Sequence, residues 1–241
     1  MNDTQQLRTA VIGLIALAGA EEQMLLGELG ACGAEQGTAQ MWAGLPIVAH
    51  DTEFKHQQVQ RLEAVRKSEP PPDFPETDHR SADAYRHYAE QSAAAVAQAS
   101  DLTTRALIDE VLSACDEDLL DHSRHPWLAG RQLWLQVVVR GFWHPMGHLG
   151  EYYLAHARPD RAVDLQGRAV ALADLLSAPE PVQGMASYNL ACAQARAKRP
   201  AAALETLGLA IRLNPQLRDN ARRDADLEVL RENGRLEALV C

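Results

Sequence analysis

Apolar residues recur at helical spacing along almost the whole chain, and this pattern constrains the fold more than any other feature. Alanine, leucine, glutamine and glutamate dominate, and hardly any stretch reads as a strand. The spacing predicts long helices over residues 4–30, 40–67, 81–119 and 129–157. Four long helices in succession are typical of an up-down four-helix bundle, so the sequence predicts an all-α fold.

Two breaks interrupt these helices. The first is EPPPDFPETD at residues 69–78, where four prolines favour an extended crossover loop or, as the alternative, a recognition peptide. The second is a polar stretch at residues 116–126, in which His122 and His125 are predicted to be solvated.

The net charge and the start of the chain narrow the classes of partner. A net charge of −10 argues against nucleic acid or an anionic membrane as the main partner. The apolar run at residues 10–20 is too short to span a bilayer, and no basic segment of a signal peptide precedes it. The four cysteines are scattered, with no CxxC pair. We therefore expect a cytoplasmic protein with free thiols, without a membrane segment and without a nucleic-acid partner.

The remainder of the chain predicts shorter helices separated by breaks that carry proline. Residues 184–217 resemble a tetratricopeptide repeat, with small, bulky and proline residues at the motif positions. These positions are Leu190, Ala191, Ala203, Leu207, Ala210 and Pro215. A weaker match begins at Leu149, inside the fourth predicted helix. We therefore expect a bundle over residues 1–157 that continues through its last helix into a repeat segment and C-terminal cap over residues 158–241.

A pair of histidines lies within the fourth predicted helix. His144 and His148 are four residues apart, so both imidazoles project from one face, and Glu151 shares that face. Pro145 cannot donate to the Gly141 carbonyl, which predicts a kink in this helix.

Two histidines are too few for a catalytic zinc-type site, which needs about three protein ligands. His50 is the best third candidate, because it lies among apolar residues of the second predicted helix. Glu53 follows three residues later on the same face. The alternative is that these histidines are buried and bonded to backbone or carboxylate groups.

The stretch around His50 and the later histidine pair together resemble the DinB-like (YfiT-like) superfamily over residues 1–157. The matching residues are Trp42, Leu45, Pro46, Ala49 and His50, followed by His144 and His148. The resemblance implies a four-helix bundle that holds a divalent metal ion through His50, His144 and His148. Imidazole ligands suit zinc, nickel, iron and copper, and zinc and nickel are the leading candidates.

The same resemblance implies a metal-dependent enzyme that acts as a thiol-dependent transferase or a hydrolase. Its partner would then be a small-molecule substrate or a low-molecular-weight thiol. Glu53 and Glu151 are candidates for a general base or for orienting a ligand histidine, the alternative being solvated glutamates. The alternative function is a non-catalytic scaffold whose repeats bind a protein or peptide, or mediate a homodimer.

Overall fold

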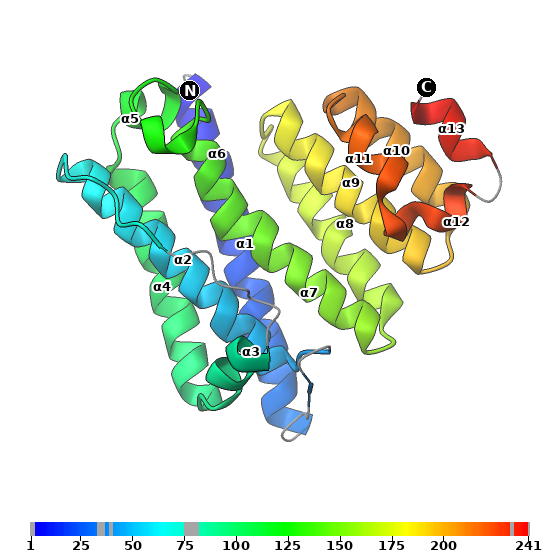
Figure 1. Cartoon of the computed structure of the whole chain (residues 1–241), viewed down its shortest axis with the longest axis horizontal. Coiled ribbons are helices and arrows are strands. Elements are labelled where there is room, and N and C mark those ends of the chain that lie inside the picture. Colours follow the sequence, from blue (N-terminus) through cyan, green and yellow to red (C-terminus); the bar gives the residue numbers. More distant parts are fainter. Residues whose placement is uncertain (1–2, 33–36, 39–40, 75–81, 232–233, 241) are drawn as a thin grey trace. The chain divides into compact units, whose positions relative to one another are not determined.

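All regular structure in the described part of the chain is helical. The structure is a computed structural model, and it describes residues 3–32, 37–38, 41–74, 82–231 and 234–240. Within these ranges it contains helices and no strand, which confirms the all-α prediction (Figure 1). The chain divides into two compact units, Met1–Tyr152 and Tyr153–Cys241. The division falls inside one helix, and the sequence-based boundary after residue 157 lies in the turn that follows that helix.

Four long helical segments form most of the first unit. They are α1 (Asp3–Cys32), α2 (Gly44–Arg66), α4 (Ala93–Ser113) and a fourth segment in which α6 (Leu133–Val138), η2 (Val139–Trp143) and α7 (His144–Ala155) follow one another directly. Both α1 and α2 pack against α4, and η2 packs against α1 and α2. The shorter elements are α3 (Ala82–Ala89), α5 (Asp116–Leu120) and η1 (Pro126–Leu128). The side chains between the long segments form the core of this unit.

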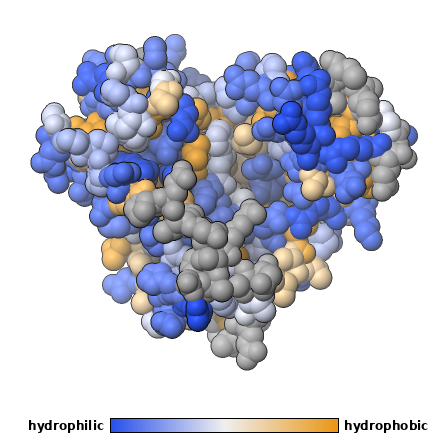
Figure 2. Space-filling view, in the orientation of Figure 1, coloured by the Kyte–Doolittle hydropathy of each residue, from blue (hydrophilic) through white to orange (hydrophobic). Residues whose placement is uncertain are grey.

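Helix α1 supplies a large share of that core. Its residues Leu14, Ile15 and Leu25 are almost completely buried. By length and composition alone, Asp3–Gly30 could cross a membrane, because the apolar helix is longer than the run at residues 10–20. However, 56% of its apolar window is buried inside the structure, as in a core helix. Figure 2 shows mostly hydrophilic residues on the face that it draws, with apolar residues in small separate patches.

The helix predicted over residues 81–119 is divided into three. Ser92 begins α4 as its N-cap, and its side chain accepts a hydrogen bond from the backbone N–H of Ala95. Cys115 begins α5 in the same way. A side chain that caps the first turn competes with helix continuation, and periodicity alone does not register this effect. Residues 69–74 are non-helical, as predicted, and the rest of the predicted loop, residues 75–78, lies outside the described residues.

The second unit is a succession of shorter helices. Its elements are α8 (Pro159–Leu175), α9 (Glu180–Arg196), α10 (Pro200–Leu213), α11 (Leu217–Arg223), η3 (Ala225–Leu227), α12 (Glu228–Arg231) and α13 (Arg235–Val240). Helix α9 packs against α8 and α10. Small residues line this packing, among them Ala191, Ala203 and Ala210, all fully buried. The last helices cover the same core through Leu217 and Leu236.

Three turns of the second unit share one geometry. Ala157, Ser177 and Lys198 each adopt a left-handed conformation, with φ of 55°, 47° and 59°. In each turn the N–H of the next residue bonds to the carbonyl oxygen five residues back, the pattern of a Schellman cap. Pro159 and Pro200 then begin the next helices, where a missing N–H costs nothing. The proline-bearing breaks are therefore helix starts.

Helices α9 and α10 approach closely at Gly184. A Cβ atom added there would lie 2.7 Å from Asn214 Cβ and 3.1 Å from the Ala210 carbonyl oxygen. We expect Gly184→Ala to destabilise the second unit by about 1–3 kcal/mol through overpacking. Gly167→Ala in α8 is the matched control, because open space surrounds that position. It should stabilise the helix by up to about 1 kcal/mol. Chemical denaturation of both variants tests this, and equal effects would contradict the packing explanation.

Candidate metal centre

A π-helical turn precedes the histidine pair in the fourth helical segment. The N–H of His144 bonds to the carbonyl oxygen of Val139, five residues back, and closes η2 just before Pro145. A proline lacks the N–H of a regular α-helical turn, and a π-turn is one way in which a helix accommodates such a defect. Gly141 lies in this turn, where a Cβ atom would meet Leu107 Cδ2 at 2.8 Å. Where the sequence predicted a kink, the structure has a widened turn that packs closely on the core.

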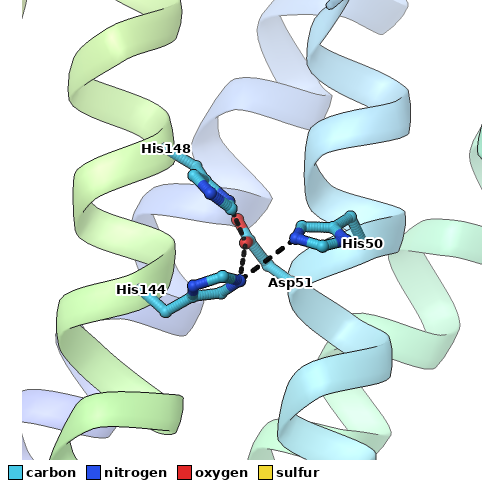
Figure 3. A group of neighbouring side chains, drawn as sticks. All are labelled: His50, Asp51, His144 and His148. Carbon is cyan, nitrogen blue, oxygen red and sulfur yellow. Dashed lines mark hydrogen bonds and ion pairs between the residues drawn. The ribbon is translucent and has the colours of Figure 1, made fainter. Parts of the chain in front are cut away.

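Four side chains from two helices converge beside this turn. Figure 3 shows His50 and Asp51 of α2 pointing toward His144 and His148 of α7. The Nε2 atoms of His144 and His50 are 3.1 Å apart, and His148 Nδ1 is 2.7 Å from Asp51 Oδ1. That oxygen is also 3.7 Å from His144 Nε2. One ligand atom from each of the four residues lies within 4.8 Å of the others.

The cluster has a buried side and a side that solvent reaches. On α2, His50 is 2% exposed and Asp51 is completely buried. On α7, the side chains of His144 and His148 are 23% and 36% exposed. Solvent therefore reaches the cluster on its α7 side, whereas the two α2 residues are closed off from it.

Asp51 is the member of the cluster that sequence reasoning missed. Burial alone would raise the pKa of its carboxyl group, but the histidines around it, His148 foremost, hold that pKa below its usual value. The Asp51 side chain is therefore a carboxylate. Its Oδ1 atom contacts His148, while Oδ2 is buried and has no hydrogen-bond partner among the described residues. The only sequence signal was an acidic residue directly next to a candidate ligand.

The donor set fits a divalent cation. Two imidazole nitrogens bound to one tetrahedral ion lie roughly 3.3 Å apart, which is close to the observed separation of His50 and His144. Asp51 contributes a negative charge, and its second oxygen is a buried acceptor without a donor, which a cation would satisfy. Imidazole and carboxylate together suit zinc, nickel, iron and manganese.

Glu53 is held by a neighbouring phenol. Tyr88 OH donates to Glu53 Oε2 over 2.5 Å, and the same hydroxyl lies 3.5 Å from His50 Nδ1. Burial and the bond to Glu53 raise the pKa of Tyr88, so the phenol keeps its proton. Glu53 is thus linked to the candidate ligand His50 through the Tyr88 hydroxyl, in a position to orient it. Glu151 lies on α7 with an exposed side chain, and it is not one of the four converging residues.

The prediction that the histidines of the polar break are solvated is wrong for His125. That side chain is 6% exposed, and its Nε2 lies 2.9 Å from the Asp118 carbonyl oxygen. His125 directly precedes η1 and contacts α5 through this carbonyl, whereas His122 remains exposed. A polar side chain in a polar stretch can still be buried when a backbone carbonyl of that stretch is its hydrogen-bond partner.

A second group of potential ligand atoms, in the second unit, is already engaged. Cys192, Asp224 and Asp226 lie near one another, but each Asp224 oxygen accepts a bond. Asp224 Oδ1 caps η3 through the N–H of Asp226, and Oδ2 accepts from Tyr188 OH over 2.7 Å. Asp226 pairs with Arg196 at 3.4 Å. Asp224 therefore serves as a helix cap, and the carboxylates of this group already have partners within the protein.

Comparison of the chain with protein-family models, with curated proteins and with solved structures finds no match. Function is therefore inferred from the side chains of the cluster. The three histidines expected from the sequence come together in the structure, and Asp51 joins them.

Proposed function

We propose that the chain is a metal-dependent enzyme of the DinB-like (YfiT-like) type, in which His50, His144 and His148 hold a divalent ion. It would act as a thiol-dependent transferase or a hydrolase on a small molecule. The observation that carries this proposal is the convergence of the three imidazoles within 4.8 Å on a cluster whose α7 side is exposed. A purely structural metal site would be closed by its protein ligands, whereas a catalytic one keeps a position for substrate.

The helix arrangement is consistent with this proposal. The packing of α1 and α2 against α4, and of η2 against α1 and α2, supports an up-down four-helix bundle of the DinB-like type. The repeated turns and the small buried residues of α9 and α10 support a tetratricopeptide-like second unit. Both assignments remain part of the proposal, together with a cytoplasmic location.

In this proposal the ion and the side chains around it have different chemical roles. A divalent ion held here supplies a Lewis acid, which lowers the pKa of a ligated water or thiol. Asp51 lowers the net charge of the cluster and fixes the ring of His148 through a 2.7 Å contact. The hydroxyl of Tyr88, which donates to Glu53, lies near Nδ1 of His50, the ring nitrogen that does not approach His144. The exposed edges of His144 and His148 leave the approach for substrate.

Elemental analysis of the untagged protein tests the proposal. We expect about one zinc or nickel ion per chain and no bound metal in His50→Ala. His56→Ala is the matched control, because His56 is an exposed histidine on the same helix, and it should keep the metal. Thiol-transfer and hydrolysis substrates would then be screened with the loaded protein, and His50→Ala should be inactive.

Absence of metal in the wild type, after incubation with zinc and nickel, would overturn the proposal. The cluster would then be a hydrogen-bonded group of a buried carboxylate and histidines. In that case the repeat segment, acting as a protein-interaction scaffold, becomes the better account of function.

A further inference from the structure

Three arginines lie near one another in a chain that is acidic overall. Arg61 of α2 and Arg131, which precedes α6, lie close enough to Arg140 of η2 that their charges act on its guanidinium. The chain has 33 acidic and 23 basic residues apart from histidine, so a basic cluster runs against its average charge. Like charges repel, and such a cluster needs a compensating anion or a strong structural reason.

Among the three, Arg140 has a buried hydrogen-bond donor that lacks an acceptor in the part of the chain that the structure describes. Its guanidinium is half-buried, and its Nε is a buried donor without a hydrogen-bond partner among the described residues. Burial lowers the pKa of Arg140, and the charges of Arg61 and Arg131 lower it further. Within the described ranges its close contact is the ring of Phe54, with 4.5 Å from Cζ to the ring centre. An aromatic face attracts the cation but leaves its N–H groups without acceptors.

The neighbouring arginines are held in a similar way. Arg61 lies 5.0 Å from the ring centre of Phe74 and 5.8 Å from that of Trp127. Asp73 is the one described carboxylate whose charge acts on Arg61. Arg131 donates through Nε to the carbonyl oxygen of Leu128. Aromatic rings thus position two of the guanidiniums without neutralising them.

Phe54 connects this cluster to the candidate metal ligands. Its ring stacks on the imidazole of His144, with centroids 4.3 Å apart and an angle of 18° between the planes. Arg140 also lies four residues before His144, about one helical turn away in the chain. An anion bound to Arg140 would therefore sit one aromatic ring away from a metal ligand.

We propose that Arg140, supported by Arg61, binds an oxyanion, a carboxylate or phosphate group, of the small molecule that the metal centre acts on. The role of this subsite in catalysis rests on the proposed function. The binding of the anion itself does not. A guanidinium offers a fork of N–H donors that matches both kinds of oxyanion. The substrate class is thus an anionic small molecule or an anionic low-molecular-weight thiol.

The test is calorimetric titration of the metal-free full chain, prepared in a buffer whose only anion is chloride, with inorganic phosphate and separately with acetate. Metal-free protein is used because phosphate could also bind a metal ion. We expect saturable binding of at least one of these anions, weakened about tenfold or more in Arg140→Gln, since a charge-assisted hydrogen bond contributes about 1.5–3 kcal/mol. Tighter binding of phosphate than of acetate would identify a phosphate-bearing substrate, and the reverse order a carboxylate.

Arg105→Gln is the matched control, because it removes one arginine from the exposed face of α4 and should leave affinity unchanged. Arg61→Gln provides a second variant, with a smaller expected loss, if Arg140→Gln does not fold. The proposal is overturned if neither anion binds the wild type, or if Arg140→Gln and Arg61→Gln both bind as tightly as the wild type. Anion binding that depends on Arg140 supports the subsite even when elemental analysis finds no metal, in which case the proposed function alone fails.

Discussion

Lys55→Met is expected to destabilise the first unit by about 3–5 kcal/mol, because it leaves the Glu22 carboxylate buried without its cation. Both side chains are fully buried, and Lys55 Nζ lies 2.5 Å from Glu22 Oε2. Burial raises the pKa of Glu22, and the charge of Lys55 opposes that rise. Urea denaturation followed by circular dichroism measures the loss of free energy.

The surrounding hydroxyls explain why the pair is costly to break. Ser100 Oγ donates to the same oxygen of Glu22 over 2.6 Å, and Lys55 Nζ donates to Thr104 Oγ1 over 3.0 Å. Removal of Lys55 takes a donor from Thr104, and removal of Glu22 takes an acceptor from Ser100, in a buried site where an unpaired polar group is expensive.

Two further variants separate charge pairing from packing. The double variant Glu22→Met, Lys55→Met should recover most of the lost stability, since apolar replacements of a buried pair are often tolerated. Lys67→Met removes a cation from an exposed pair with Glu63 and should change stability by less than about 1 kcal/mol. If Lys55→Met costs no more than Lys67→Met, the buried pair does not stabilise the fold in the way described.

Asp51→Asn is expected to weaken metal binding by about 10–100-fold, the range found when a carboxylate partner of a metal ligand is removed. The substitution keeps the shape of the side chain and removes its charge. His148 Nδ1 would lose the carboxylate that lies 2.7 Å away, and the cluster would lose its one negative group. Competition between the protein and a chelator for zinc measures the change in affinity.

A second histidine–carboxylate contact supplies the control. Asp118 Oδ1 lies 3.9 Å from His125 Nε2, away from the cluster, and Asp118→Asn should leave metal affinity unchanged. Unchanged affinity in a folded Asp51→Asn variant would show that Asp51 takes no part in binding. The histidine site itself would still stand in that case, because the metal content of His50→Ala tests it separately.

Features carried by a few neighbouring residues were predictable. The four-residue spacing of His144 and His148 places both rings on one face of a helix, whatever that helix packs against. Pro145 predicted a kink from its missing N–H, and the structure has a π-helical turn directly before it. Helix starts at Pro159 and Pro200 follow from the same chemistry.

The role of Asp51 was not predictable in this way. Adjacent residues of a helix point about 100° apart. The choice of His50 as a ligand therefore excluded Asp51 from the same face of the helix. In the structure, the α7 histidines lie where both side chains can reach them. The helix break at Ser92 was also missed, because apolar residues continue at helical spacing on both sides of this cap.

Helical periodicity, terminating prolines and ligand spacing are local properties, so the amino-acid order alone indicated an all-α chain with three candidate ligands. Contacts between distant segments came only with the tertiary structure. His50 meets His144 across 94 residues, and Glu22 meets Lys55 across 33. Such meetings depend on how helices pack, which is the sum of many weak contacts that no short stretch of sequence contains.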